Sequence, residues 1–230
     1  LTISPTFYLA SNGVTIKCYG CSAGDTGMVS GTLYTAVGNG SGTNGIQTFV
    51  NAGNYNLVTT LVTNMSGLFD GNTSFNTDIG FWDTSNVTTM YEMFKGATSF
   101  NQNIGAWDTS SNTNMTRMFR NANSFNQNIG NWNTANVTTM SSTFIAANAF
   151  NQNIGAWNTS KVTDMSFMFS VNRGFNNGGS NTINNWDTSS VTTMNQMFYQ
   201  ADAFNQDIGN WNTSSVTNMD GMFQYNDNFN

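Results

Sequence analysis

Few side chains in this chain could carry out chemistry. It has no histidine and only two cysteines, and its one glutamate is Glu92. A structural zinc site needs about four ligands, and a nucleophile needs a base beside it. A glycosidase needs two carboxylates in unequal environments, whereas the Asp residues here mostly fall at repeated positions. We therefore expect a protein that is not an enzyme and that uses no cofactor and no metal.

The two cysteines are Cys18 and Cys21, in a Lys-Cys-Tyr-Gly-Cys segment that is typical of strand and turn. A disulfide across the turn is the interpretation that we favour, and disulfides persist outside the cytosol. Asn-x-Ser/Thr triplets could accept glycans in an exported protein, although many of them follow from the Asn- and Thr-rich composition. These triplets begin at Asn39, Asn64, Asn72, Asn86, Asn114, Asn136, Asn158 and Asn212.

Tryptophan recurs with a nearly constant spacing along the chain. It stands at positions 82, 107, 132, 157, 186 and 211, so the steps are 25, 25, 25, 29 and 25 residues. A fixed period of this length is typical of solenoids, in which each coil buries its apolar side only against its neighbours. Stacked copies present the same residue again and again, which is a further argument against a catalytic site.

The apolar columns of the repeat predict the elements of each coil. Met90, Met93, Phe94 and Ala97 follow the i, i+3, i+4, i+7 pattern of a short amphipathic helix. The stretch from Ile104 to Trp107 is too short for a helix and suits a short strand. We therefore predict a leucine-rich-repeat-like solenoid of about seven 25-residue coils in parallel stacking, each with one short strand and one short helix.

Three polar columns indicate turns between these elements. Asn follows the second Phe of every copy, as in Phe100-Asn101, and predicts an amide ladder along the stack. Asp and Asn interchange at position 83 and its equivalents, which indicates a turn acceptor and not a catalytic carboxylate. The Gly column at 80, 105, 130, 155 and 209 predicts a backbone with positive φ.

The period divides the chain into two parts. Residues 1–56 lack it and predict a β-rich N-terminal cap, with strands at 6–10, 14–19 and 32–37 and a short helix at 46–52. Residues 57–230 form the repeats, with a four-residue insertion near 176–181 that we expect to be a flexible polar loop. The last copy is open, so it could be an assembly end formed by Met219, Met222, Phe223, Phe229 and Asn230.

The charge of the chain excludes several partners. Only 8% of the residues are charged, the net charge is −6, and six residues are basic. Such a chain offers no stripe of positive charge for a phosphate backbone, so we expect no nucleic acid as a partner. Acidic membrane surfaces would likewise repel it. No apolar run approaches the length of a membrane span. The start at Leu1 would suit a mature secreted product.

The segment Phe100-Asn101-Gln102-Asn103-Ile104-Gly105-Ala106-Trp107-Asp108-Thr109-Ser110, followed by Val-Thr-x-Met-x-x-Met-Phe, resembles the repeat of BspA-type leucine-rich-repeat surface proteins of bacteria. The similarity extends over about residues 57–230, and the segments 8–10 and 20–27 look like the region that precedes such repeats. The resemblance implies export, cell-surface display and binding to proteins or matrices, and it supplies no catalytic residues.

Together these features predict a non-enzymatic structural scaffold that is extracellular or on the cell surface. The open last copy favours a filament subunit, in which the chain binds itself head to tail. A monomeric adhesin that binds a host or matrix protein or glycan is the alternative. A third hypothesis is binding to ice or to a crystal surface through two Thr columns, which begin at Thr84 and Thr88.

Overall fold

The computed structural model describes residues 4–230. Its N-terminal part begins with an antiparallel hairpin of β1 (Thr6–Leu9) and β2 (Ile16–Tyr19). The connecting turn contains Gly13 at a φ of 71°, and the side-chain oxygen of Asn12 accepts the N–H groups of Val14 and Thr15. Because a backbone at positive φ favours glycine, the Ser-Asn-Gly sequence closes this hairpin as predicted.

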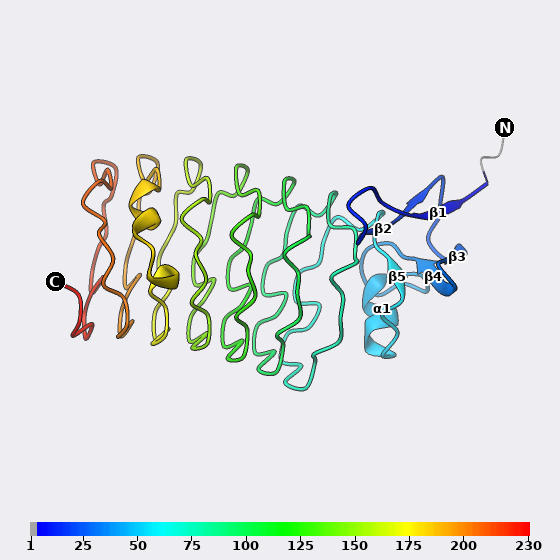
Figure 1. Cartoon of the computed structure of the whole chain (residues 1–230), viewed down its shortest axis with the longest axis horizontal. Coiled ribbons are helices and arrows are strands. Elements are labelled where there is room, and N and C mark those ends of the chain that lie inside the picture. Colours follow the sequence, from blue (N-terminus) through cyan, green and yellow to red (C-terminus); the bar gives the residue numbers. More distant parts are fainter. Residues whose placement is uncertain (1–3) are drawn as a thin grey trace.

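A second, three-stranded sheet has the order β3-β4-β5 (Figure 1). β3 (Thr26–Val29) pairs antiparallel with β4 (Thr32–Ala36), and β4 pairs parallel with the short β5 (Leu57–Val58). Helix α1 (Ile46–Asn51) buries its two apolar residues in the same core as the first repeat. The predicted strands at 6–10, 14–19 and 32–37 and the helix at 46–52 are confirmed, whereas β3 was not predicted.

The predicted fold class is wrong for the repeats. Between residues 59 and 230 the structure contains no β-strand and no α-helix, so these are not seven leucine-rich-repeat-like coils with one strand and one helix each. The repeats instead consist of consecutive turns, and one isolated parallel bridge joins each copy to the next, as at Asn64–Thr89 and Thr89–Asn114. Figure 1 shows these copies side by side in a row that leads away from β1–β5.

Hydrogen bonds between copies explain why the expected helix does not form. In the second copy, alternate N–H groups donate to carbonyls of the third copy, as from Glu92 to Thr116 at 3.0 Å and from Phe94 to Met118 at 2.9 Å. The N–H groups in between close i→i−3 turns, as from Met93 to Met90. An α-helix would need every one of these groups for i→i−4 bonds, so the bonds to the next copy exclude it.

Two positions in each copy have positive φ, which also breaks a helix. Their φ values lie between 50° and 71° although most of these residues are not glycine. Side chains at such φ values cost about 1–3 kcal/mol each, so surrounding bonds must hold them. The two columns are Gly67, Glu92, Arg117, Ser142, Phe167, Gln196 and Gly221, and Gly71, Gly96, Asn121, Ala146, Val171, Gln200 and Tyr225.

Equivalent aromatic side chains lie over one another through the whole row. Phe94 and Phe119 have ring centroids 5.5 Å apart, and Trp132 and Trp157 are 6.5 Å apart, with interplanar angles of 7° and 3°. Within one copy, Phe94 stacks on Phe100 at 4.1 Å. Offset stacks of this kind add to the burial of apolar area. The two Phe columns therefore run without a break through the core of the repeats.

The glycine column does not have the positive φ that we predicted. Gly80, Gly105, Gly130, Gly155 and Gly209 are absent from the residues of positive φ in residues 4–230. A Cβ at Gly105 would instead lie 2.7 Å from the backbone oxygen of Asn128 in the next copy. Glycine is needed here because two turns approach closely, which no pattern within a single copy reveals.

The insertion is packed and is not a loose loop. It forms two short 3₁₀ helices, η1 (Asn177–Gly179) and η2 (Asn181–Asn185). Asn177 is buried, and its side chain accepts the N–H of Ile154 and donates to the carbonyl of Ser180. The extra residues thus bond to the preceding copy. After them, Ile183 is buried at the position equivalent to Ile154.

Candidate binding surfaces

The Asn ladder lies along one edge of the row. The side-chain oxygen of Asn76 accepts the backbone N–H of Asn101 at 2.9 Å, and each later pair repeats the bond. Gln102 adds a bond from its amide to the carbonyl of Asn76. The predicted ladder is present, and its acceptor oxygens are used to join copies. The remaining donors in it are Asn126, Asn151, Asn176, Asn205 and Asn230.

The two Thr columns differ in their exposure. Thr84 is buried, and its hydroxyl donates to the carbonyl of Asp108 in the next copy. Thr88 is exposed, and its hydroxyl donates to the carbonyl of Thr63 in the preceding copy. Because the first column does not face solvent, the two cannot form the flat surface that the ice- or crystal-binding hypothesis requires.

The Asp/Asn column forms Asx turns. The side-chain oxygens of Asp108 and Asn133 each accept the N–H group two residues later, at 3.0 and 3.1 Å. Asp83 differs from its equivalents because its side chain is only 1% exposed and lies 3.2 Å from the Lys17 ammonium. Burial raises the pKa of Asp83, but hydrogen bonds from Ser85 and Thr60 and the charge of Lys17 outweigh it and lower the pKa overall.

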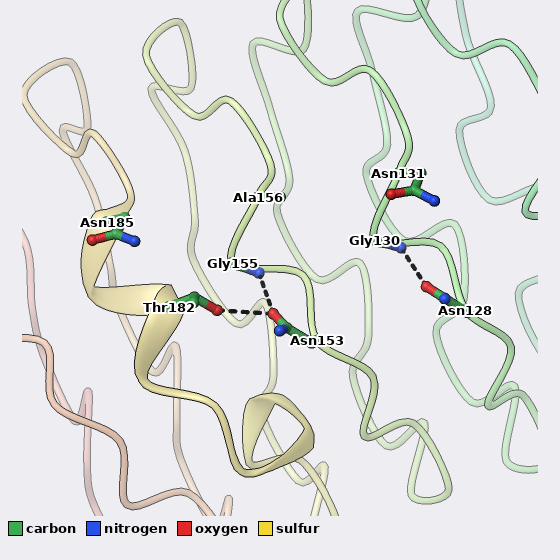
Figure 2. Close-up of a pocket in the computed structure, with 8 residues that line it drawn as sticks. All are labelled: Asn128, Gly130, Asn131, Asn153, Gly155, Ala156, Thr182 and Asn185. Carbon is green, nitrogen blue, oxygen red and sulfur yellow. Dashed lines mark hydrogen bonds between the residues drawn. The ribbon is translucent and has the colours of Figure 1, made fainter.

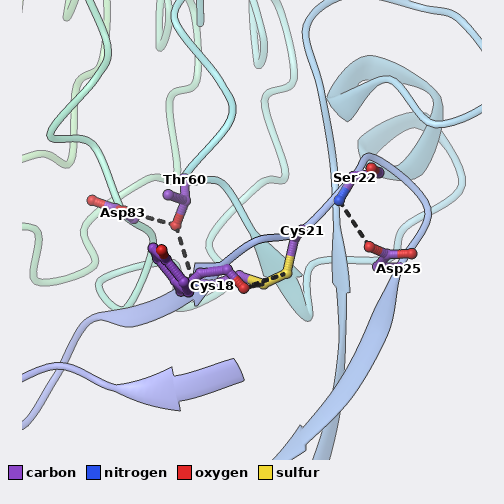
Figure 3. The surroundings of a disulfide bond; sticks show 7 residues. Cys18, Cys21, Ser22, Asp25, Thr60 and Asp83 are labelled. Atoms are coloured by element: carbon purple, nitrogen blue, oxygen red, sulfur yellow. Dashed lines mark hydrogen bonds between the residues drawn. A yellow bond between two sulfur atoms is a disulfide. The ribbon is translucent and has the colours of Figure 1, made fainter. Parts of the chain in front are cut away.

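Figure 3 shows how this carboxylate ties the N-terminal part to the first repeat. The N–H of Cys18 donates to the Thr60 hydroxyl, which donates to Asp83 at 2.8 Å. The structure joins Cys18 and Cys21 in a disulfide, with Cα atoms 5.9 Å apart. The disulfide therefore closes the turn after β2, next to the contact between β2 and the repeats.

A charged cluster lies on the turns of the first three repeats. Glu92 contacts Lys95 at 2.8 Å and Arg117 at 3.0 Å, and Lys95 also reaches Asp70 at 3.0 Å. Burial raises the pKa of Glu92, yet the hydrogen bonds from Lys95, Arg117 and Tyr91 lower it to about 2. A carboxyl group with such a pKa stays ionised and makes a poor proton donor or acceptor near neutral pH.

The predicted assembly end lies on the last repeat. Met219 is 39% exposed, Phe223 and Phe229 are half-buried, Asn230 is exposed, and Met222 is buried. In earlier copies, alternate N–H groups donate to carbonyls of the next copy. In the last repeat, the four equivalent N–H groups have no acceptor within residues 4–230. They belong to Met219, Gly221, Phe223 and Tyr225. The predicted residues therefore lie on one repeat, but not all of them are accessible.

The proposed glycan acceptors are exposed, except for half-buried Asn114. Glycosylation modifies the amide nitrogen, and in three of them this nitrogen donates a hydrogen bond within the protein. Asn39 donates to the Thr63 hydroxyl, Asn86 to the Thr60 carbonyl and Asn136 to the Ser110 carbonyl. These three are poor acceptors in the folded chain. Within residues 4–230, the amide nitrogens of the other five make no such bond; these are Asn64, Asn72, Asn114, Asn158 and Asn212.

A polar hollow of about 380 Å³ crosses three consecutive repeats beside η2 (Figure 2). We call it the amide hollow, and it is lined by Asn128, Gly130, Asn131, Asn153, Gly155, Ala156, Thr182 and Asn185. The side-chain oxygen of Asn153 accepts both the N–H of Gly155 and the Thr182 hydroxyl. This hollow was not predicted. Its one signal in the sequence is a column that varies between copies, as Phe81, Ala106, Asn131, Ala156, Asn185 and Asn210.

The chain matches a known protein family. The sequence model described as "Mycoplasma protein of unknown function, DUF285" matches residues 43–154 and 125–230. This match supports a bacterial repeat family of the surface type and does not identify the BspA-type leucine-rich-repeat proteins in particular. No curated protein and no solved structure matches the chain.

None of the helices in residues 4–230 has the length and hydropathy that a membrane crossing requires. Within the same residues, no group of three or more Asp, Glu and Cys side chains is arranged to hold a metal ion.

Proposed function

Because the chain belongs to the DUF285 family, we propose that it is a non-enzymatic scaffold that acts outside the cell, on a bacterial surface. One observation carries this proposal. The polar columns that could have supplied reactive groups are committed to hydrogen bonds that join copies or close turns, as at Asn76, Thr84 and Asp108. What remains exposed is a periodic, weakly charged surface, which suits binding and display.

Protease treatment of intact cells that carry the chain tests the surface location. We expect external trypsin to shorten or remove the protein while a cytosolic marker stays intact, because basic residues such as Arg173 are exposed. Cys18 and Cys21 should resist a thiol-reactive polyethylene glycol until a reductant is added. A protein that is protected until the cells are lysed would contradict the proposal.

Self-assembly is a second candidate, and the bonds between copies favour it. Alternate N–H groups of each copy donate to carbonyls of the next copy, and Met219 and Tyr225 are exposed on the last repeat that the structure describes. A row of such N–H groups next to apolar side chains is a template for another chain. A filament would form if a second copy of this chain bound that repeat in the same orientation each time.

Sedimentation velocity over a range of concentrations tests the filament. We expect species that grow with concentration and that are lost in a variant with Met219→Asp and Tyr225→Asp. Ser99→Asp serves as the control, because Ser99 is exposed on the side of the row. A monomer at every concentration would contradict the filament and leave a monomeric scaffold, such as an adhesin.

A further inference from the structure

The amide hollow offers hydrogen-bonding groups that the fold does not use. Asn128 and Asn153 accept N–H groups through their side-chain oxygens, which leaves their amide nitrogens without an acceptor among residues 4–230. The side chains of Asn131 and Asn185 make no hydrogen bond with any of these residues. In Figure 2 these two lie on opposite sides of Ala156, which occupies the equivalent position in the copy between them.

The chemistry of the lining selects the type of ligand. No charged and no aromatic side chain lines the hollow, and Ala156 is its only side chain without a polar atom, apart from the glycines. The amides of Asn131 and Asn185 each offer a donor and an acceptor, and those of Asn128 and Asn153 add donors. A hydroxyl group can pair with either, whereas an ion would find no opposite charge and an apolar ligand would leave the amides unpaired.

The spacing of the repeats selects a chain-like ligand. Equivalent rings of the copies that border the hollow are 5.5 to 6.5 Å apart, as for Phe119 and Phe144 or for Trp132 and Trp157. This spacing is comparable to the length of one sugar unit in an extended glycan. A chain of such units would therefore present hydroxyl groups to successive copies at a matching interval.

We infer that the amide hollow binds a neutral oligosaccharide of about three units, with Asn131 and Asn185 contacting its ends and Ala156 leaving room for the middle unit. This inference rests on the proposed function as a binding scaffold and names its ligand class. An extended peptide is a poorer fit, because the hollow is built from turns and η2 and has no strand edge whose N–H and C=O groups could pair with a peptide.

The absence of an aromatic platform predicts weak binding. Sugars gain much of their affinity by stacking on aromatic rings. Here only hydrogen bonds hold the sugar, and each of them replaces a hydrogen bond to water with little net gain in free energy. We expect a Kd in the millimolar range for one isolated trisaccharide. Useful affinity on a surface would then arise from many copies that act together.

Titration of the full chain with trisaccharides, followed by NMR of the Asn side-chain amides, tests the inference. The probes are cellotriose, maltotriose and triacetylchitotriose, with sialyllactose as the anionic probe and a capped alanine tripeptide as the peptide probe. We expect at least one neutral trisaccharide to shift the amide signals of Asn131, Asn153 and Asn185. The anionic and peptide probes should leave these signals unchanged.

Variants of exposed residues locate the site without disturbing the core. Ala156→Trp, which fills the middle of the hollow, and Asn131→Ala with Asn185→Ala should each weaken binding at least tenfold. Asn210→Ala is the matched control, because Asn210 is the exposed residue in the same column of the next copy, outside the hollow. Equal effects of the control and of the hollow variants would overturn the inference, as would the absence of any shift with neutral sugars or stronger shifts with the peptide.

The same samples separate this inference from the proposed function. The sugar signals report whether the bound trisaccharide stays intact during days of incubation. An intact sugar agrees with both. A cleaved sugar would contradict the non-enzymatic scaffold and leave the binding site in place, whereas failure to bind would remove the site and leave the scaffold.

Discussion

At the scale of single residues, the charges and buried amides of this chain have opposite effects on its stability. Glu92 is surrounded by partners that favour its ionised form. Asn172 is fully buried, and neither atom of its side-chain amide has a hydrogen-bond partner in residues 4–230. Paired charges stabilise the fold at neutral pH, whereas an unpaired buried amide costs free energy.

We predict that Glu92 makes the stability of the protein depend on pH. Its pKa is about 2 in the folded state against 4.5 for a free side chain, so its contribution is complete above pH 4.5 and is lost as the pH falls towards 2. Glu92→Gln should lower the free energy of unfolding by about 1–2 kcal/mol at pH 7, since the ion pairs are partly solvated. Urea unfolding at pH 7 and at pH 2.5 measures this difference, which should nearly vanish at the lower pH.

Asn172 leads to a prediction of the opposite sign. The equivalent residue is Ala in four other copies, so the surrounding turns can close around a smaller side chain. Asn172→Ala should therefore raise the free energy of unfolding by about 1–2 kcal/mol, because two unpaired polar atoms leave the core. Asn72→Ala in the same column is the control and should change it by less than about 0.5 kcal/mol, since Asn72 is exposed. A loss of stability in Asn172→Ala would show that the cavity outweighs the unpaired amide.

At the scale of elements, the repeat is a set of turns that is complete only when another copy lies next to it. The alternate N–H groups of one copy find their acceptors on the next, and residues with positive φ orient them. A single copy in isolation would expose these groups and gain little from its few i→i−3 bonds. Each turn thus depends on its neighbour for its conformation.

The glycine column gives a direct test of this dependence. Gly105→Ala should lower the free energy of unfolding by about 1–3 kcal/mol, because its Cβ would press against the backbone oxygen of Asn128. Gly209→Ala is the matched control in the last repeat, where a Cβ would meet only the side chain of Asp207 at 3.2 Å. Chemical denaturation of both variants decides the matter. Equal losses would mean that glycine is needed for its conformation and not for the close approach.

At the scale of the whole molecule, part of the N-terminal region shares the core of the repeats, whereas Ile16, Cys18, Val29 and Val58 form a second, smaller cluster. α1 contributes Ile46 and Val50 to the buried cluster that continues through the row of aromatic rings. The side-chain oxygen of Asn39 accepts the N–H groups of Thr63 and Asn64, which begin the first repeat. The N-terminal part therefore covers the first copy in the way that each copy covers the one after it.

We predict that Asp83 fastens β2 to the repeats. Asp83→Asn keeps an acceptor for Ser85 but removes the charge opposite Lys17, so unfolding of residues 6–37 should become easier by about 1–2 kcal/mol. Hydrogen exchange of the β1 and β2 amides measures this local opening. Asp108→Asn is the control, because Asp108 is exposed and makes the same turn without a lysine partner. The pKa of Asp83 is lowered, so the effect should disappear as the pH falls below 3.8.

The sequence by itself determined which side chains lie inside and which polar columns join the copies. Residues that recur every 25 positions occupy equivalent environments, so the ring columns and the Asn ladder followed from the period alone. It also located the hairpin, because the Asn12-Gly13 turn is a local signal.

Only the tertiary structure decided the conformation of each repeat. The spacing of Met90, Met93, Phe94 and Ala97 fits an α-helix and a series of turns equally well, since both bring these side chains to one face. The choice depends on where the N–H groups donate, and their acceptors lie about 24 residues away in the next copy. For the same reason, the close approach at Gly105 and the amide hollow beside Ala156 became visible only once the copies were placed together.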